Sequence, residues 1–319
     1  MENKYDYIGN SFLGNTWKEL FDEIRRVMLF APEVETRIGK TKELLNPVLI
    51  LTNPRSRLFY SKHRSFNLTY AFVESFMIFH NQNNVKPFAY FNKKMNDYSD
   101  NGVTLNSAYG QFVADNIKGI VEKLKNDKNT RQACIRIYDT KYGLSNTKDV
   151  PCTLDLHFLI RDNKLNMTTY MRSNDLFWGL QYDLFVFTTI QEVVANELGL
   201  ELGVYIHCPT SLHVYDYHYD VLDKINSAET IEIPEIKITN SIDEMNKIAK
   251  EIIDLVNTDE LNVSKLNEYI NDDLNNDGKK IIEKYVLRKM GIHNVINIDS
   301  KYKLFLPKYF KEKEGIDNV

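Results

Sequence analysis

The strongest constraint on the fold is a pair of alternating segments in the middle of the chain. Between residues 154 and 160 every second residue is apolar, and the same period of two continues from residue 165 to residue 171, with Thr169 at one of the apolar positions. The four residues between the segments, 161–164, are charged or polar. Alternation on both sides of a short polar connection predicts a β-hairpin with one buried face.

Helices and further strands are predicted around this hairpin. Helical patterns cover residues 16–30, 68–80, 107–125 and 184–198, and strand patterns cover residues 47–51, 133–137, 204–207 and 211–217. From about residue 234 the pattern becomes helical, with one stripe over residues 242–255 and a second stretch that runs into Met290. We therefore expect an α+β fold in two parts, a catalytic domain over residues 1–233 and a helical C-terminal extension over residues 234–319.

Composition limits the classes of protein to consider. The chain has 319 residues, of which 43% are hydrophobic and 26% charged, an ordinary globular balance. Its formal net charge of -4 argues against direct nucleic-acid binding, which needs clustered positive charge. We expect no membrane association, because no apolar run is long enough to cross a bilayer and the first residues lack a signal-peptide pattern. Three cysteines are too few for a disulfide framework, so a cytoplasmic location is expected.

Cys152 follows a proline at the start of the first alternating segment, at a sheet edge that a ligand can reach. A free cysteine is most often a small buried hydrophobe, and that interpretation suits Cys134 and Cys208. Arg172 follows the second segment, and hairpin pairing would bring it near Cys152, where it would lower the thiol pKa and favour the nucleophilic thiolate. Arg172 with Ser173 would also suit a phosphate, whereas a strand-end surface charge is the competing interpretation of Arg172 alone.

His213 and Tyr215 are two residues apart, so on a strand they face the same side. Such a pair suits hydrogen bonding to a sugar hydroxyl, and a half-buried polar face is the alternative. With His218 they supply no set of ligands at metal-binding spacing, so no metal site is predicted. The segment that begins at Asp273 resembles the start of a calcium-binding loop, but Lys284 stands where a bidentate glutamate is required.

These features together resemble the thymidylate synthase family. Over residues 130–218 the order and spacing agree for Pro151-Cys152, the hairpin, Arg172-Ser173 with Asp175, Gly179, and His213 with Tyr215 and His218. Upstream, family counterparts are expected at Arg37 with Gly39, at Glu74, and at Tyr109-Gly110. Past about residue 230 no resemblance is evident, and the family's folate-closing C-terminal tail is not found. The resemblance implies a thymidylate-synthase-like fold, in which flanking helices cover a large mixed sheet.

The resemblance also implies a covalent mechanism in nucleotide biosynthesis. Cys152 would attack C6 of a pyrimidine nucleoside monophosphate, so that C5 takes a one-carbon unit from 5,10-methylenetetrahydrofolate. Glu74 would organise water and proton transfer near the base, with help from Tyr109. If Glu74 were instead an ordinary surface carboxylate, its apolar surroundings in the sequence would be unusual, because burying an unpaired carboxylate is costly.

Other residues would bind the two ligands, as the resemblance implies. The 5′-phosphate would be held by Arg37, Arg172 and Ser173. Arg131 would reach the phosphate bound to the other subunit, which implies a homodimer with shared sites. The pterin would be met by Asp175, and the ribose 3′-hydroxyl by His213 and Tyr215.

Three departures from the family pattern narrow the function. Gln132 stands where a second phosphate-binding arginine is usual, Thr153 where a histidine is common, and Asp183 where an asparagine is usual. An asparagine suits uracil, because its carbonyl accepts from N3–H and its amide donates to O4. Cytosine presents the reverse edge, which a carboxylate matches by accepting from N4–H and by sharing one proton with N3. Asp183 therefore indicates a cytosine nucleotide, although an aspartate can also cap the helix that follows.

The leading interpretation is a deoxycytidylate (dCMP) 5-hydroxymethyltransferase similar to phage-type relatives in the family, in which water rather than hydride completes the new group. For a phage-encoded enzyme, the cytoplasm would be that of the host. The alternatives are a thymidylate synthase that methylates dUMP, a relative that methylates dCMP or CMP, and a non-catalytic nucleotide-binding homologue. The joint presence of Cys152, Arg172, Glu74 and His213 argues against the last, because a binding module needs no nucleophile.

Overall fold

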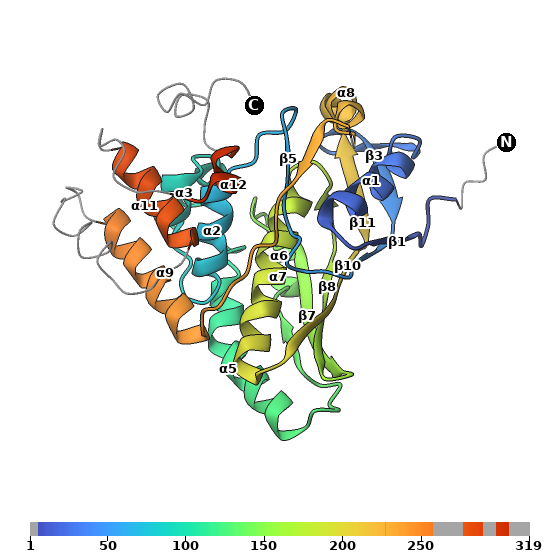
Figure 1. Ribbon diagram of the computed structural model, residues 1–319. Coiled ribbons are helices and arrows are strands. Elements are labelled where there is room, and N and C mark those ends of the chain that lie inside the picture. Colours follow the sequence, from blue (N-terminus) through green and yellow to red (C-terminus); the bar gives the residue numbers. More distant parts are fainter. Residues whose placement is uncertain (1–5, 227, 258–276, 290–297, 306–319) are drawn as a thin grey trace.

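The structure is a computed structural model that describes residues 6–226, 228–257, 277–289 and 298–305 (Figure 1). Its strands are β1 (Ser11–Gly14), β2 (Glu33–Thr36), β3 (Gly39–Leu45), β4 (Val48–Leu51), β5 (Phe59–Ser61), β6 (Cys134–Arg136), β7 (Thr153–Arg161), β8 (Lys164–Met171), β9 (Asn174–Asp175), β10 (Glu201–Pro209), β11 (Ser211–Tyr215) and β12 (Thr230–Glu232). Its helices are α1 (Trp17–Met28), α2 (Leu68–Met77), α3 (Val85–Phe91), α4 (Met95–Tyr98), α5 (Gly110–Asn126), α6 (Thr140–Gly143), α7 (Gly179–Leu198), α8 (Tyr219–Lys224), α9 (Ile242–Asn257), α11 (Asp277–Lys289) and α12 (Ser300–Lys303), with the 3-10 helix η1 (Asp216–His218).

The predicted hairpin is confirmed as β7 and β8, which lie in a six-stranded sheet of order β1-β4-β10-β8-β7-β6. The two strands pair antiparallel up to Arg161 and Lys164. Asp162 and Asn163 form the connection with φ angles of 50° and 57°, the left-handed conformation that suits a tight two-residue turn. Because β10 runs parallel to β8, the sheet is mixed, as expected.

Helix α7 is the central helix of the molecule (Figure 1). It packs against β8 and β10 on one side and against α2 and α5 on the other. Every residue from 184 to 195 is buried, as expected for a helix that is covered on all sides. The helical pattern in the sequence placed its start at residue 184, but the helix begins at Gly179, and it ends at Leu198 with Gly199, whose φ is 63°, as its C-cap.

The helices predicted in the first half of the chain are confirmed. Helix α1 begins after Thr16, whose side chain accepts from the backbone of Glu19 while the Glu19 carboxylate accepts from the Thr16 backbone. This reciprocal capping box satisfies donors that a helix start leaves free. Helix α2 is largely buried between α7 and the outer helices, and Glu74 is one of its half-buried residues.

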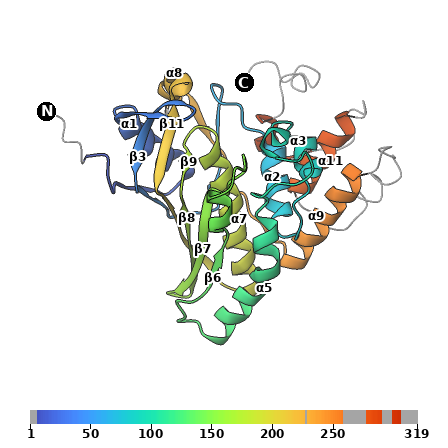
Figure 2. The ribbon, with the colours of Figure 1, turned by 180° about the vertical axis from the view of Figure 1, so that it is seen from behind.

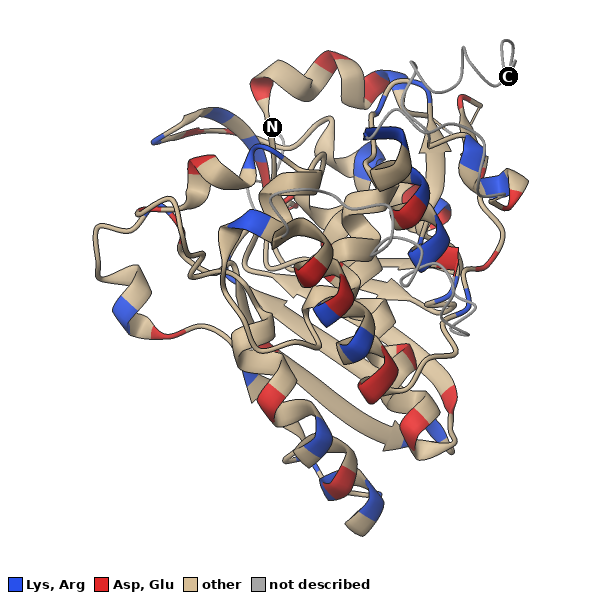
Figure 3. Cartoon of the chain, turned by 90° about the vertical axis from the view of Figure 1, so that its left-hand side faces the viewer, with Lys and Arg blue, Asp and Glu red and all other residues tan. Residues whose placement is uncertain are grey.

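The helices of the C-terminal extension form the outermost layer. Helices α9 and α11 both pack on α2, and α9 also contacts α3, as the views from opposite sides show (Figures 1 and 2). Acidic and basic residues are interspersed along the helices that face the viewer in Figure 3. The first four residues of the segment that resembles a calcium-binding loop, 273–276, lie outside the described residues, and Lys284 is part of α11.

Two features are absent from the described residues. None of their helices is both long enough and apolar enough to cross a membrane. They contain no cluster of three or more histidine, cysteine, aspartate or glutamate side chains that could hold a metal ion.

Candidate active site

The open end of the hairpin brings Cys152 and Arg172 together. Cys152 immediately precedes β7, and Arg172 immediately follows β8, so strand pairing makes them neighbours across the sheet. The Arg172 backbone N–H donates to the Cys152 carbonyl oxygen at 2.8 Å, and Nη2 lies 3.4 Å from the Cys152 Sγ. The same guanidinium donates to the carbonyl oxygens of Pro151 at 3.0 Å and Val150 at 2.9 Å, which fixes its plane. The contact expected from hairpin pairing is present.

The expected low pKa of the Cys152 thiol is not observed in the protein by itself. Burial raises the pKa of Cys152, and the nearby carboxylates of Asp183 and Asp149 raise it further. The positive charge of Arg172 opposes them, as the sequence indicated, but it does not outweigh burial. The expected effect of Arg172 is present, but the net direction was not predicted, because a sequence pattern shows the neighbouring charge and does not show how deeply the sulfur is enclosed.

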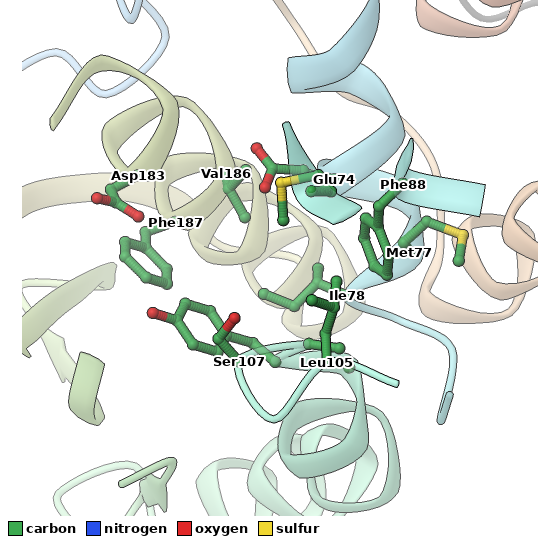
Figure 4. A pocket seen from close by; sticks show the side chains of 13 residues that line it. Glu74, Met77, Ile78, Phe88, Leu105, Ser107, Asp183, Val186 and Phe187 are labelled. Carbon is green, nitrogen blue, oxygen red and sulfur yellow. The ribbon is translucent and has the colours of Figure 1, made fainter. Parts of the chain in front are cut away.

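Two carboxylic acids from different helices line a cavity of about 140 Å³ (Figure 4). Glu74 comes from α2 and Asp183 from α7, and Tyr109 also lines the cavity. Most of the other lining side chains are apolar, among them Met77 and Phe187. A small cavity with two acids and an apolar wall is suited to holding part of a ligand against groups that exchange protons.

Burial raises the pKa of both acids. The pKa of Glu74 rises to about 8, mainly through burial and further through the charge of Asp183, while the Tyr70 hydroxyl partly offsets the rise. The pKa of Asp183 rises to about 7 through burial, and a hydrogen bond from Asn174 partly offsets it. Both groups therefore exchange a proton near neutral pH, which suits general acid–base chemistry.

Tyr109 connects the cavity to the nucleophile. Its hydroxyl accepts a hydrogen bond of 3.3 Å from the backbone N–H of Thr153, the residue after Cys152. Burial raises the pKa of Tyr109, and the charges of Cys152 and Asp183 add to the effect. The tyrosine therefore stays protonated and lies near both the thiol and the acid, although more than forty residues separate it from Cys152 in the sequence.

A second sheet, of order β2-β3-β11-β9, carries the polar pair predicted at residues 213 and 215. His213 on β11 pairs in register with Asp175 on β9, and the rings of His213 and Tyr215 lie 5.2 Å apart between centroids. Burial lowers the pKa of His213, while the carboxylates of Asp175 and Glu43 oppose the change. His213 and Tyr215 share one face of the strand, as predicted.

The residues predicted to bind the phosphate lie on separate segments of the structure. Ser173 follows Arg172 directly and is partly buried. Arg37 is exposed in the turn between β2 and β3. Burial raises the pKa of Tyr215, and the charge of Arg37 partly opposes that rise. Arg131 is exposed just before β6. The single chain thus places Ser173 and Arg37 in the region of the site, and it offers Arg131 on an exposed segment.

Asp183 does not cap helix α7. The helix begins at Gly179 after Trp178, so Asp183 lies in the second turn. Asp175 serves the helix entry instead, because its Oδ1 accepts from the backbone N–H groups of Phe177 at 2.7 Å and Trp178 at 3.1 Å. The interpretation of Asp183 as a cap is therefore wrong, and Asp183 is one of the residues that line the cavity.

Sequence reasoning missed Arg64 and Tyr98. Arg64 is buried, and within the described structure its three guanidinium nitrogens have no hydrogen-bond partner. It lies over the ring of Phe177, 5.5 Å from the centroid, and burial lowers its pKa to about 10 although the charge of Asp175 raises it. Tyr98 on α4 is half exposed; burial of its phenol raises its pKa, and the charges of Cys152 and Asp175 add to the rise. Neither residue belongs to a pattern that marks a site in the sequence.

A chain of buried polar groups behind Asp183 was also missed. Asn174 donates from Nδ2 to Asp183 Oδ2 at 2.6 Å, and behind it lie His207 and Tyr205 of β10. The sequence places His207 in an ordinary strand pattern and gives Asn174 no role. Strand pairing and the path of α7 bring the four side chains together.

Comparison with known proteins gives a consistent result. A family model described as thymidylate synthase matches residues 40–267, which includes α9 and so extends past residue 230, where the resemblance had not been evident. The T4 phage thymidylate synthase structure matches with a TM-score of 0.57 and 19% identity, over 71% of this chain and 89% of that chain. At that identity the match supports the fold, and the expected thymidylate-synthase-like fold is confirmed.

Curated relatives include phage hydroxymethyltransferases. A deoxyuridylate hydroxymethyltransferase of Bacillus phage SP01 is 31% identical over 285 residues, which cover 78% of this chain and 74% of that protein. A protein of the same description from Pseudomonas phage M6 is 32% identical over 200 residues, covering 60% of this chain and 56% of the relative. The chain therefore spans less than two thirds of the M6 protein. A putative thymidylate synthase of Methanocaldococcus jannaschii is 28% identical, covering 63% of this chain and 88% of that protein.

Proposed function

Because the chain belongs to the thymidylate synthase family, whose one-carbon donor is 5,10-methylenetetrahydrofolate, we propose that it hydroxymethylates C5 of dCMP. The observation that carries the proposal is Asp183, an acid with a pKa of about 7 on the wall of a cavity near Cys152. A carboxylic acid that stays neutral in part near pH 7 can donate one hydrogen bond and accept another.

Cys152 is the proposed nucleophile, and Arg172 is its partner. Addition of the Cys152 sulfur to C6 of the pyrimidine makes C5 nucleophilic. Since burial raises the thiol pKa in the protein alone, formation of the thiolate depends on the guanidinium at 3.4 Å. The C5 proton must later leave, and Glu74 and Tyr109, which both line the cavity, are suited to organise that transfer.

The base edge distinguishes the substrates. On cytosine, N3 accepts a hydrogen bond and N4 donates one, so a protonated Asp183 can donate from one oxygen and accept at the other. Uracil presents the opposite arrangement, N3–H as donor and O4 as acceptor. We assign cytosine because an asparagine, which the family usually has here, suits uracil without any proton on the side chain.

The residues around Asp175 fit a folate, which when bound supplies the one-carbon unit. Arg64 offers a buried guanidinium without a partner in the described structure, and the aromatic rings of Phe177 and Trp178 lie in edge-to-face contact next to Asp175. A flat heterocycle with an anionic tail suits such a set, since rings bind by stacking and a guanidinium binds carboxylates. We propose that Asp175 and Arg64 hold the folate and that Tyr98 covers the approach to it.

Phosphate and sugar binding complete the proposed substrate site. Arg172 and Ser173 would hold the 5′-phosphate with Arg37, and His213 with Tyr215 would bind the ribose 3′-hydroxyl. The exposed Arg131 would contribute from a second subunit, so we propose a homodimer with composite sites.

The dimer has a direct test. Arg131→Ala subunits and Cys152→Ala subunits should each be inactive, and mixing them should restore activity, because one of the two sites in a mixed dimer keeps both residues. Light scattering on the unmodified protein gives the mass. A fully active monomer, or no recovery in mixtures that exchange subunits, would contradict the proposal.

Deoxyuridylate is the second candidate substrate. The relatives from phages SP01 and M6 are described as deoxyuridylate hydroxymethyltransferases, which supports hydroxymethylation and favours dUMP over dCMP. Further candidate functions are methylation of dUMP, dCMP or CMP with hydride as the last step, and nucleotide binding without catalysis. The division of the chain at residue 233 and a cytoplasmic location remain predictions.

One incubation separates these candidates. The purified protein is given methylenetetrahydrofolate with dCMP, dUMP or CMP, and the nucleotide products are identified by mass. We expect hydroxymethyl-dCMP and regenerated tetrahydrofolate, with Cys152→Ala as the matched inactive control. A methylated product with dihydrofolate would show hydride transfer. Faster turnover of dUMP would replace dCMP by the second candidate, and no product from any nucleotide would leave only the binding function.

A further inference from the structure

Four side chains form a continuous chain of hydrogen bonds that ends at Asp183. The Tyr205 hydroxyl lies 2.9 Å from His207 Nδ1, His207 Nε2 lies 3.0 Å from Asn174 Oδ1, and Asn174 Nδ2 lies 2.6 Å from Asp183 Oδ2. Tyr205 and His207 are fully buried, and Asn174 is 5% exposed. Water therefore does not compete for these groups, and each depends on the next for its hydrogen bond.

The hydrogen bonds that link the four side chains all run in one direction. Burial lowers the pKa of His207 to about 3, so its ring carries a single proton at neutral pH. Because Asn174 Oδ1 can only accept, that proton is on His207 Nε2, and Nδ1 accepts from the Tyr205 hydroxyl. Asn174 then donates to Asp183 Oδ2. Every donor in the chain points toward Asp183.

Gly179 leaves the space that the last of these bonds needs. A Cβ atom at this position would lie 3.0 Å from Asn174 Nδ2 and 3.5 Å from Asp183 Oδ2. The first distance is closer than ordinary van der Waals contact between such atoms. The first turn of α7 therefore has no side chain where Asn174 reaches Asp183.

We propose that Asn174, oriented by His207 and Tyr205, keeps the proton of Asp183 on Oδ1 and thereby makes Asp183 complementary to one pyrimidine edge only. An oxygen that receives an N–H donor is a poor place for a proton, so Oδ2 stays an acceptor. A carboxylic acid that is free to carry its proton on either oxygen would match both cytosine and uracil. Fixing the proton removes one of the two matches, which makes Asn174 a specificity-determining positioning residue.

This inference rests on the proposed function in one respect, the contact between Asp183 and the base. It does not depend on which base is preferred. If the unmodified enzyme favours dUMP, the assignment to dCMP fails, but removal of the Asn174 donor must still weaken the preference. The two ideas can therefore fail separately.

The main test compares kcat/KM for dCMP and dUMP. Asn174→Leu removes the donor at similar volume, and we expect the ratio of the two values to fall by about tenfold or more, mainly through faster use of the disfavoured nucleotide. Thr188→Val is the matched control, because it removes a buried hydroxyl from the same helix that bonds only to α7 carbonyl oxygens, those of Leu184 and Phe185. The control should keep the ratio. An unchanged ratio in Asn174→Leu would overturn the inference.

A second pair of variants separates the effect of the hydrogen bond to Asn174 from the effect of side-chain packing. His207→Gln keeps an amide that can donate to Asn174, whereas His207→Phe keeps the bulk and offers no donor. We expect the glutamine variant to retain the ratio and the phenylalanine variant to lose about threefold or more. Should Asn174→Leu fold poorly, this pair decides whether the hydrogen bond to Asn174 or the packing around it sets the preference for one base. Equal dCMP to dUMP ratios of kcat/KM in both variants would contradict the inference.

Carbon-13 NMR of the Asp183 carboxyl gives a readout that packing alone would not move. The hydrogen bond from Asn174 lowers the pKa of Asp183, so Asn174→Leu should raise the titration midpoint above the value of about 7. The other titratable groups whose charges reach Asp183 are Cys152, Glu74, Tyr109 and Tyr205. The control Thr188→Val leaves all of them in place, and its midpoint should stay at the unmodified value. A midpoint that does not rise in Asn174→Leu would also overturn the inference.

Discussion

Helix α7 carries two acids, Glu192 and Asp183, that are enclosed by the same fold but have different partners. Glu192 is fully buried, and its carboxylate forms ion pairs with Arg57, which is also fully buried, and with Arg55 at 2.6 Å. Arg57 donates in addition to Thr189 at 2.8 Å. Asp183, two to three turns earlier, has an amide as its hydrogen-bond partner and no ion pair among the described residues.

The difference shows what separates a structural acid from a reactive one. Two arginines neutralise Glu192, so this carboxylate serves to hold the segment before α2 against α7. No cation neutralises Asp183 within the described structure, and burial raises its pKa to about 7. A buried acid without a counter-charge stores unfavourable energy in its ionised form, and it keeps a proton available for a ligand.

The largest expected effect is the loss of turnover when the proposed nucleophile, which lies near the reactive acid Asp183, is replaced. Cys152→Ser should lower kcat by several orders of magnitude, because a serine hydroxyl without a strong base is a far weaker nucleophile. Nucleotide binding and the melting temperature should stay near the unmodified values. Turnover and release of tritium from C5 of the substrate are the measurements. Near-normal turnover would end the covalent mechanism.

Removing the structural acid should damage the fold instead. Glu192→Gln leaves the guanidinium of Arg57 buried beside a neutral amide, and breaking a buried ion pair costs about 3–5 kcal/mol of unfolding free energy. Urea denaturation followed by circular dichroism measures the loss. Glu201→Gln is the control, because its ion pair with Lys164 is long, at 3.9 Å, and exposed. A loss below that of the control would mean that the Arg57 pair does not stabilise the fold.

Changing the reactive acid should alter the choice of base. Asp183→Leu removes both hydrogen-bonding groups that would match the base edge, and two lost groups at about 1–3 kcal/mol each give a change of roughly a hundredfold in the dCMP to dUMP ratio of kcat/KM. Phosphate binding through Arg172 and Ser173 should remain. The measurement is kcat/KM for both nucleotides in the variant and in the unmodified protein. If the ratio is the same in both, Asp183 does not read the base.

The smallest expected effect is a dependence of stability on pH. The folded pKa of Asp183, about 7, lies above its ordinary value of 3.8, so the folded state binds the extra proton between these limits. Stability therefore falls as pH rises from about 4 to about 7, by about 2 kcal/mol if water in the cavity halves the effect of full burial. Glu74, whose pKa is about 8, adds to the fall over the same range, so Asp183→Asn should lose only the share of the slope that Asp183 contributes, while Glu192→Gln should keep the whole slope. Equal slopes in Asp183→Asn and the unmodified protein would contradict the assignment.

Much of the fold was accessible from local pattern. The period of two predicted β7 and β8, and the helical stripes predicted α1, α2, α5 and α9, because each pattern reflects which side of one element meets the core. The start of α7 was missed, since residues 179–183 lack the apolar run that marked the rest of the helix. In the site, the contact of Cys152 with Arg172 could be predicted because a hairpin has only one pairing that joins its ends.

The order of residues is enough to specify the elements, the family and the contact of Cys152 with Arg172, all of which depend on neighbours along the chain or on one hairpin. The chemical state of the groups in the site depends instead on tertiary packing. Burial raises the pKa of Cys152, Glu74 and Asp183, and burial depends on all the elements that pack around a residue. The link from Tyr205 and His207 through Asn174 to Asp183 joins β10, β9 and α7, so no local pattern could reveal it.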